Sequence, residues 1–306
     1  MQPTALILGG SGRFGRHAHI AFRDAGWRVR LFDRSRDSLW DAAWGASAIV
    51  NGWNPAYADW ARHIPAYMDE LVEVAEATGA VVLQPGNIYN FGPDVPDLIG
   101  PNTPQLATNG LGRVRVQLEA RWRRSSARVI VLRAGDFLDT EKSGNWFDRI
   151  IAAKVTKGVL TYPGRLDATH TWAWLPDLAR AGVALVERAS VLPRFADVPF
   201  RGYTMSGLEL ARAMSTALGA PIDLRKMSWA PVQLAAPFWP MGRHLCEIRY
   251  LWDTPHSLSD AELMRYVPEF RVTPVEDALR LAVQDHIHPH QPMARRRLYV
   301  GRARIV

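Results

Sequence analysis

The sequence predicts an α/β fold: a doubly wound parallel sheet with a smaller C-terminal α+β domain. Three observations carry this prediction. Short apolar runs alternate with helical patterns through the first half of the chain, as in parallel strands joined by crossover helices. The first apolar run ends in regularly spaced glycines. Beyond about residue 158 the alternation weakens and tryptophan and proline become dense, which indicates a second and smaller unit.

The expected strands of the sheet are short apolar runs, of the kind that a parallel sheet buries on both faces. They lie at 5–10, 27–33, 46–52, 80–86 and 127–137. Between these runs, apolar residues at helical spacing predict helices. The helices are expected at 13–25, 59–79 and 105–125.

The second half of the chain is predicted to be mainly helical. Helices are expected at 176–189, 206–219 and around 231–253, 258–266 and 274–287, with one strand at 221–229. Ser206 and Gly219 suit the two ends of their helix, as N-cap and C-cap. The expected domains are residues 1–158 with 171–200 for the sheet, 159–170 with 201–288 for the smaller unit, and 289–306 for a basic tail.

Three glycines, each three residues after the last, follow the first strand and open the first helix. Gly9 allows a sharp turn, Gly12 lets the backbone approach a pyrophosphate, and Gly15 lets the helix pack close to the sheet. The free N–H groups at the start of the helix also suit phosphate. This context predicts dinucleotide binding rather than a tight turn without a ligand. The intervening residues expected to contact the pyrophosphate are Ser11, Arg13 and Phe14.

The end of the second strand bears on the choice of nucleotide. Asp33 stands where a carboxylate would accept the ribose hydroxyls of NAD. Arg34 and Arg36 stand just beyond it, where guanidinium groups would bind the 2′-phosphate of NADP. The two arginines favour NADP if both point inward, and NAD is the alternative.

These motifs resemble the extended and atypical short-chain dehydrogenase/reductase superfamily, in particular its NAD-dependent epimerase/dehydratase-like branch. AIVNGWN (48–54) resembles its strand and loop over the cofactor, which brings in Asn51 and Gly52. GNIYNFG (86–92) and VLRAGDF (131–137) resemble two further segments of that superfamily, and TWAWLPDLARA (171–181) a third. The resemblance spans nearly the whole chain. It implies a Rossmann fold, hydride transfer, and substrates that are often nucleotide sugars.

The catalytic residues of that superfamily do not carry over. Its enzymes use Ser or Thr with a Tyr four residues before a Lys. In this chain the Ser position falls on Pro85, at the end of a strand beside the expected cofactor, the Tyr position on Asn109 and the Lys position on Arg113. Asn109 has no titratable proton, whereas Arg113 keeps a charge that suits ribose or phosphate. Tyr89 is then the nearest tyrosine, either beside the reacting carbon or as a packing aromatic.

A second departure is a deletion. Between Asp33 and the strand at 46–52 only about a dozen residues remain, where that superfamily fits a strand and a helix. We therefore expect a shortened adenine pocket and a sheet that is one strand narrower.

Two functions follow from these residues. One is an atypical reductase or epimerase that acts on a nucleotide sugar or another carbonyl compound without the usual triad. The other is a non-catalytic NAD(P)-binding sensor or partner-binding protein. His170, which lies between Asp167 and Asp177, is a general acid or base by chemical type, or else a packed residue.

Composition limits the alternatives. The chain has 306 residues and one cysteine, Cys246, which excludes an intramolecular disulfide and a cysteine-based metal cluster, and no metal is expected. It lacks an apolar run of membrane-spanning length and the layout of a signal peptide, so a cytoplasmic protein without a membrane partner is expected.

The excess positive charge is local. The formal net charge is +7, and five arginines without an acid lie in 295–306. Nucleic acid is therefore not an expected partner. A homodimer through the helix at 105–125 is possible in this superfamily, but Arg121, Arg123 and Arg124 would need acidic partners.

Overall fold

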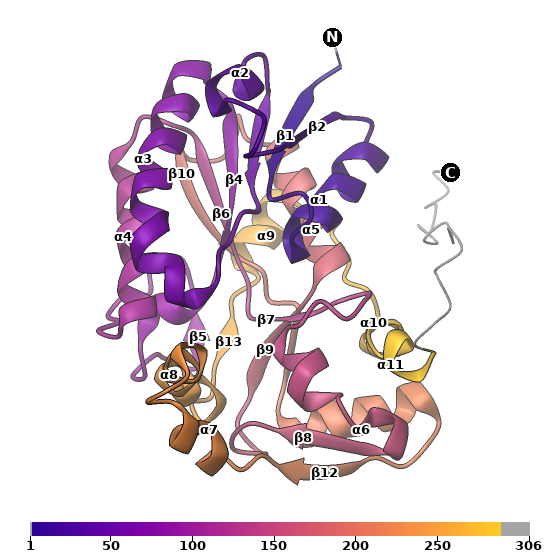
Figure 1. The fold of residues 1–306 in the computed structure, drawn as a ribbon. Coiled ribbons are helices and arrows are strands. Elements are labelled where there is room, and N and C mark those ends of the chain that lie inside the picture. The colour runs from indigo at the N-terminus through magenta and orange to yellow at the C-terminus, as the bar shows by residue number, and fades with distance from the viewer. Residues whose placement is uncertain (1, 289–306) are drawn as a thin grey trace, which may run out of the picture.

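The computed structural model describes residues 2–288. A six-stranded sheet with its helices forms the upper part of Figure 1, and a smaller mixed unit forms the lower part. The smaller unit includes residues 136–174, which the expected limits at 158 and 171 divide, because the strands at 136–138 and 170–174 pair with each other and not with the large sheet. All pairs in the large sheet are parallel, in the order β10-β6-β4-β3-β1-β2. The doubly wound parallel sheet is thereby confirmed. Its strands are β1 (Thr4–Leu8), β2 (Arg28–Phe32), β3 (Ala48–Asn51), β4 (Val81–Gly86), β6 (Val129–Arg133) and β10 (Phe195–Pro199).

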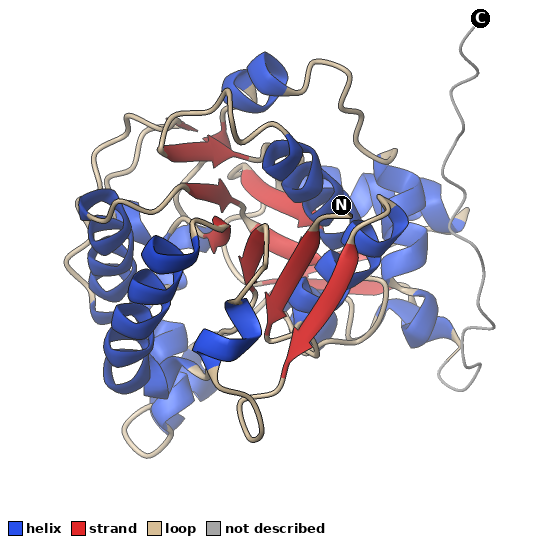
Figure 2. Cartoon of the chain, turned by 90° about the horizontal axis from the view of Figure 1, so that it is seen from above, coloured by secondary structure: helices blue, strands red, loops and turns tan. Residues whose placement is uncertain are grey.

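Helices cover both faces of this sheet, as Figure 2 shows from above. Alternate residues of each strand face opposite sides. In β1, Leu6 and Leu8 pack on the core under α3 and α4, whereas Ala5 and Ile7 pack on the core under α1 and α5. These helices are α1 (Arg13–Asp24), α3 (Trp60–Thr78), α4 (Gly110–Arg124) and α5 (Leu175–Glu187).

The edge of the sheet confirms the expected deletion. Strand β2 is outermost, and the connection from β2 to β3 contains only the short helix α2 (Leu39–Ala43). The sheet therefore ends one strand earlier than the family resemblance implies.

The predicted strand at 127–137 is wrong in one respect, because it is two strands. After β6 the chain turns at Gly135 and enters β7 (Asp136–Leu138), which belongs to another sheet. A Cβ at Gly135 would lie 2.0 Å from the carbonyl oxygen of Thr171. This close crossing lets β7 pair with β9 and ends the longer run.

The smaller unit contains more strand than the sequence predicts. Its sheets have the orders β11-β9-β7, β12-β8 and β13-β5. The further strands are β5 (Leu98–Ile99), β8 (Val159–Tyr162), β9 (His170–Trp174), β11 (Tyr203–Met205), β12 (Asp223–Lys226) and β13 (Ser257–Leu258). The further helices are α6 (Gly207–Leu218), α7 (Ala230–Ala235), α8 (Pro240–Glu247), α9 (Ala261–Tyr266), α10 (Val275–Ala282) and α11 (Gln284–Ile287).

The predicted ends of α6 are confirmed. Ser206 and Glu209 form a reciprocal capping box, and Gly219 ends the helix with φ +63°. The basic tail predicted at 289–306 lies outside the described residues. Within residues 2–288, no helix has both the length and the apolar character that crossing a membrane requires.

A buried ionic network joins the sheet to α4. Arg133, at the end of β6, is fully buried, and its Nη2 donates hydrogen bonds of 2.7 Å to Glu119 and to Asp197. Its Nη1 donates to the carbonyl oxygen of Asn87, also at 2.7 Å. One guanidinium therefore holds α4, β10 and the turn after β4.

We expect Arg133→Met to destabilise the protein by about 3–5 kcal/mol, because Glu119 and Asp197 would be left buried without a counter-charge. The measurement is the free energy of unfolding in urea. The control is Arg201→Met, which breaks an exposed pair with Asp260 and should cost at most about 1 kcal/mol. Equal losses in the two variants would contradict the prediction.

Candidate functional site

The glycine turn after β1 has the geometry that the sequence predicts. Gly9 has φ +68°, and a Cβ there would lie 2.8 Å from the backbone of Trp53. A Cβ at Gly15 would lie 2.1 Å from the carbonyl oxygen of Gly9. Gly12 caps α1 without a side-chain hydrogen bond, and the first turn of α1 has no acid. The start of α1 therefore offers its N–H groups to an anion.

The side chains near this turn have different roles. Ser11 is exposed, whereas Phe14 is buried in the core, so only the backbone of Phe14 is available at the helix start. Arg13 crosses to the smaller unit, where its Nε donates a hydrogen bond of 2.9 Å to the carbonyl oxygen of Ser143.

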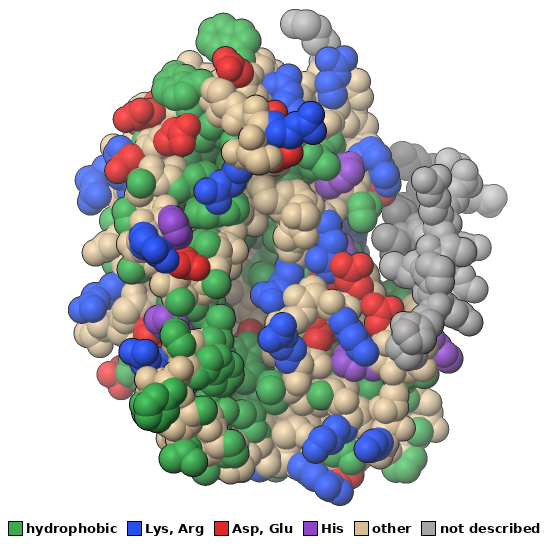
Figure 3. Space-filling view, in the orientation of Figure 1, with side chains coloured by type: hydrophobic (Ala, Val, Ile, Leu, Met, Phe, Trp, Pro, Cys, Tyr) green, Lys and Arg blue, Asp and Glu red, His purple; other side chains and the backbone are tan. Residues whose placement is uncertain are grey.

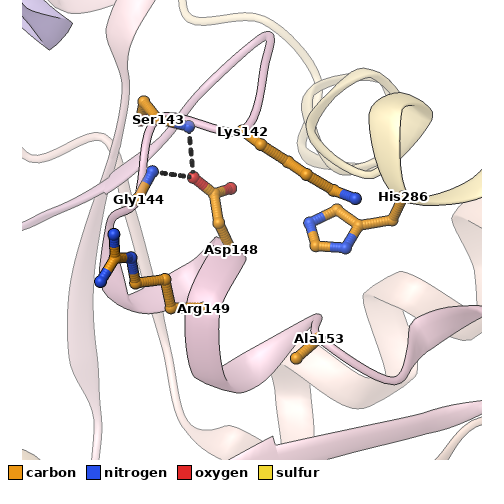
Figure 4. A pocket seen from close by; sticks show the side chains of 7 residues that line it. All are labelled: Lys142, Ser143, Gly144, Asp148, Arg149, Ala153 and His286. Carbon is orange, nitrogen blue, oxygen red and sulfur yellow. Dashed lines mark hydrogen bonds between the residues drawn. The ribbon is translucent and has the colours of Figure 1, made fainter. Parts of the chain in front are cut away.

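A second basic group meets Arg13 at the junction of the two units. The guanidinium groups of Arg13 and Arg149 both approach Gly144, since a Cβ there would lie 3.6 and 3.1 Å from them. Beside them is a cavity of about 560 Å³ (Figure 4). Asp148 accepts hydrogen bonds there from the N–H groups of Ser143 and Gly144. The cavity is lined by Lys142, Ser143, Gly144, Asp148, Arg149, Ala153 and His286.

Two further side chains of α1 bind the smaller unit. The Nε2 of His17 donates a hydrogen bond of 2.8 Å to Asp139, and Arg16 pairs with Asp139 and with Glu141. Burial raises the pKa of Asp139, but the hydrogen bond from His17 and those from Ser143 and Arg16 outweigh burial and lower it to about 2. The helix that begins at the glycine turn is thus fixed to the smaller unit.

At the end of β2, the carboxylate of Asp33 binds its own loop. Its Oδ1 accepts hydrogen bonds from the hydroxyl and the N–H of Ser35, at 2.7 and 3.0 Å, which lower its pKa. Arg34 is exposed, and its guanidinium carbon lies 4.6 Å from the ring centre of Trp53. Trp53 packs in turn on Tyr67, with ring centres 4.3 Å apart.

The loop after β3 contributes backbone rather than free polar groups. Asn51 is buried and donates a hydrogen bond of 2.8 Å to Gln84, while it accepts one from Tyr67. A Cβ at Gly52 would lie 2.8 Å from the carbonyl oxygen of Leu8. Pro85 pairs with β6 inside the sheet. These three residues form the part of the sheet edge that lies beside the glycine turn.

Tyr89 lies with a second tyrosine that the sequence analysis missed. The hydroxyl groups of Tyr89 and Tyr57 are 2.7 Å apart. Burial raises the pKa of Tyr89 well above its ordinary value, and Tyr57 and Asp136 raise it further. Burial also raises the pKa of Tyr57. Both phenols are therefore neutral near pH 7 and can donate hydrogen bonds.

The structure places Arg115, rather than Arg113, beside these tyrosines. Arg113 is exposed, and two residues along a helix point to opposite sides. Arg115 is buried, stacks on Trp60 at 4.1 Å and donates a hydrogen bond of 2.8 Å to Asn54. Burial lowers its pKa to about 10, which still leaves it charged at neutral pH.

The position four residues before Arg115 is Leu111, which is buried and has no proton to transfer. Asn109 is the N-cap residue of α4, and its amide atoms have no hydrogen-bond partner among the described residues. The N–H of Leu111 is bound instead by the carboxylate of Glu247 on α8, at 2.6 Å. The start of α4 is therefore covered by the smaller unit.

A carboxylate and a histidine complete this region. The Nε2 of His170 donates a hydrogen bond of 2.8 Å to Asp136 rather than to Asp167 or Asp177. His170 is fully buried and stacks on Trp252, with ring centres 4.2 Å apart, whereas the Asp136 side chain is 22% exposed. Asp136 is thus the accessible member of the pair.

Helical phase is the sequence signal that could have found Arg115. The buried residues of α4 recur at Leu111, Arg115, Leu118 and Trp122, which is one face of a helix. Arg113 lies off this face. Tyr57 lies where the chain has no periodicity, and Asp136 lies inside the strand predicted at 127–137, so helical phase marks neither of them.

Comparison by sequence finds no relative: no protein-family model and no curated protein matches the chain.

Solved structures do match the fold. MoeE5 in complex with UDP-glucose and NAD gives a TM-score of 0.70 at 14% identity, over 94% of this chain and 99% of that one. Human epimerase family protein SDR39U1 with NADPH gives 0.68 at 17% identity, over 92% and 99%. The GalE-like L-threonine dehydrogenase from Cupriavidus necator, in its apo form, gives 0.70 at 19% identity, over 95% and 100%. The chain therefore has the fold of the extended short-chain dehydrogenase/reductases, as its motifs imply.

We expect the hydrogen bonds to Asp139 to add about 2 kcal/mol of stability at neutral pH, because its pKa falls from an ordinary 3.8 to about 2. This contribution is present above about pH 4 and is lost as the pH falls towards 2. The free energy of unfolding, measured for wild type and Asp139→Asn across that range, should converge at low pH. Asp24→Asn, at the exposed end of the same helix, is the control. A difference that does not change with pH would refute the expectation.

Proposed function

We propose that this protein is an NADP(H)-dependent oxidoreductase of the short-chain type that transfers hydride to a carbonyl compound or from the corresponding alcohol. The observation that carries the proposal is the cluster of Tyr57, Tyr89 and Arg115. Tyr57 follows the carboxyl end of strand β3 and Tyr89 that of β4, which is the edge where open α/β sheets bind ligands. The glycine turn ends the neighbouring strand β1 at the same edge. The fold also supports the proposal, because solved structures with this fold contain NAD or NADPH.

The choice of NADP(H) rests on the contrast between Asp33 and Arg34. Asp33 is engaged by Ser35, so it is less available for ribose hydroxyls. Arg34 is held over Trp53, next to the glycine turn, where its guanidinium suits a 2′-phosphate. At the other end of the turn, the N–H groups of α1 and the side chain of Arg13 suit the pyrophosphate. NAD is the alternative.

The residues of the cluster would act on the carbonyl oxygen. The bound nicotinamide supplies or accepts the hydride. Tyr89 donates a hydrogen bond to the carbonyl oxygen and gives up its proton as negative charge develops there, Tyr57 passes its own proton to Tyr89 through their shared hydrogen bond, and a proton from solvent restores Tyr57 before the next turnover. The charge of Arg115 stabilises the developing anion in this buried site. Asp136, the accessible partner of His170, adds negative charge near the two tyrosines.

Nucleotide sugars are the first substrate class to test. A solved structure with this fold contains UDP-glucose, and the guanidinium group of Arg149 beside the cavity suits a phosphate group. A homodimer through α4 is a further proposal. Two of the arginines on this helix already have acidic partners within the chain. Arg121 binds Asp69 at 3.0 Å, and Arg123 lies 3.9 Å from Asp197, so neither requires an acid from a second copy.

A specific observation favours the second function, a dinucleotide sensor without turnover. The hydroxyls of Tyr57 and Tyr89 satisfy each other, and Leu111 stands four residues before the arginine. Such a protein would bind NADP(H) and respond to it without chemistry.

We expect NADPH to raise the melting temperature by several degrees at about 100 times its dissociation constant. Arg34→Ala should weaken NADPH binding at least about tenfold and leave NADH binding unchanged, because a charged hydrogen bond to the 2′-phosphate would be lost. Arg28→Ala, an exposed arginine at the opposite end of strand β2, is the matched control. Isothermal titration calorimetry measures the dissociation constants of NADPH and NADH for wild type and for each variant. If none of the four nicotinamide dinucleotides binds, the proposed function is wrong.

We expect Tyr89→Phe to lower kcat about a hundredfold on whichever carbonyl substrate the wild type turns over, with NADPH affinity unchanged. A panel of nucleotide sugars and simple carbonyl compounds, followed at the NADPH absorbance, supplies that substrate. Tyr67→Phe, outside the cluster, is the control. NADPH binding with no turnover across the panel would favour the sensor.

A further inference from the structure

An uncharged segment forms an exposed tip on the smaller unit. The residues 227–242 (MSWAPVQLAAPFWPMG) contain no charged side chain. Basic residues stand on both sides, Arg225 and Lys226 before the segment and Arg243 after it. No acid occurs between Asp223 and Glu247. An apolar centre with basic flanks and no acid is a pattern typical of segments that lie on anionic membranes.

The structure shows that most of this apolar segment is not used as core, although Trp229 is buried. It folds into α7, a short turn and α8, and hydrophobic side chains gather there at the lower left of Figure 3. Leu234 is 81% exposed, Phe238 is 91% exposed and Trp239 is 42% exposed. Single exposed apolar residues are ordinary, but a contiguous apolar protrusion marks an interaction site.

The tip is held in place rather than loose. Trp229, before α7, is 5% exposed and its Nε1 donates a hydrogen bond to the carbonyl oxygen of Pro163. The ring of Trp239 lies directly on Gly242, where a Cβ would be 2.5 Å from it. At the far end, Glu247 binds the N–H of Leu111 on α4. The apolar side chains are therefore presented outward by an anchored frame.

We propose that this tip, with Leu234, Phe238 and Trp239, docks the protein on the surface of an anionic lipid bilayer. The three side chains would enter the interfacial region, where aromatic side chains are favoured. Lys226 and Arg243 are exposed, so they can bind anionic headgroups, whereas Arg225 is exposed but paired with Asp223 at 2.7 Å. This charge pattern is the reason to choose a lipid surface over a second copy of the chain. Surface docking needs no membrane-spanning helix.

Docking would place the candidate site close to the bilayer. Helix α8 leads from the tip to Tyr57, whose ring centre is 6.4 Å from that of His244, and to the start of α4. A substrate carried in the membrane would then reach the cluster past α8. The docking proposal itself is independent of the proposed function.

The test is co-sedimentation of the full chain with vesicles of phosphatidylcholine and phosphatidylglycerol, against vesicles of phosphatidylcholine alone. Wild type should bind the anionic vesicles, and binding should weaken as salt rises. Leu234→Ser with Phe238→Ser should lower the partition coefficient at least about tenfold, because the inserting side chains are lost. Arg243→Gln should lower it about fivefold.

Two controls keep the result interpretable. Val191→Ser removes an apolar side chain that is 70% exposed elsewhere, and it should not change vesicle binding. Circular dichroism and melting temperature check that each variant is folded. No binding of wild type to anionic vesicles would overturn the proposal. So would an oligomer, seen by analytical ultracentrifugation, that Phe238→Ser dissociates while vesicle binding is absent or unchanged.

Discussion

The charge of Arg133 is the constraint on which the rest of the site depends. A fully buried guanidinium must be neutralised and hydrogen bonded, and this one is surrounded by two carboxylates and a carbonyl oxygen. The partners come from α4, β10 and the turn after β4, so satisfying one charge fixes three segments. Tyr89 lies two residues beyond Asn87, and Arg115 lies one helical turn before Glu119. The positions of both cluster residues therefore follow from a single buried ionic network.

Burial also determines what the cluster can do. In the superfamily that the motifs resemble, a lysine lowers the pKa of the tyrosine. Here burial raises the pKa of both tyrosines, and the positive charge of Arg115 only partly opposes it. Both phenols are consequently donors rather than bases near neutral pH. This chemistry suits the polarisation of a carbonyl oxygen better than the removal of a proton from an alcohol.

The sequence predicted the local structure correctly where only one physical reason explains the residue type at a position. The glycine turn is such a case, since Gly9 needs a positive φ and Gly15 has no room for a Cβ. The narrower sheet also followed from a simple count of residues between β2 and β3. Homodimerisation, the domain limits and the roles of the site residues stay predictions.

The predictions failed where tertiary contacts decide. Strand β9, HTWAW, is buried on every residue and mixes polar with aromatic side chains, so it lacks the alternation that marks a strand. Strand β10 contains Asp197, which is tolerated only because Arg133 lies beside it. The count along the chain that selected Arg113 did not use the helical phase of α4: Arg113 is exposed, whereas Arg115 lies on the buried face, and the role of either arginine stays a prediction.

The attachment of α1 to Asp139 has a consequence for the working of the whole molecule. The helix that begins at the glycine turn also bridges to the smaller unit, through Arg13, Arg16 and His17. A ligand at the start of α1 and a ligand between the two units would therefore both contact helix α1 or the residues bound to it. Thermodynamic reciprocity then requires that if the first ligand tightens the second by some factor, the second tightens the first by the same factor.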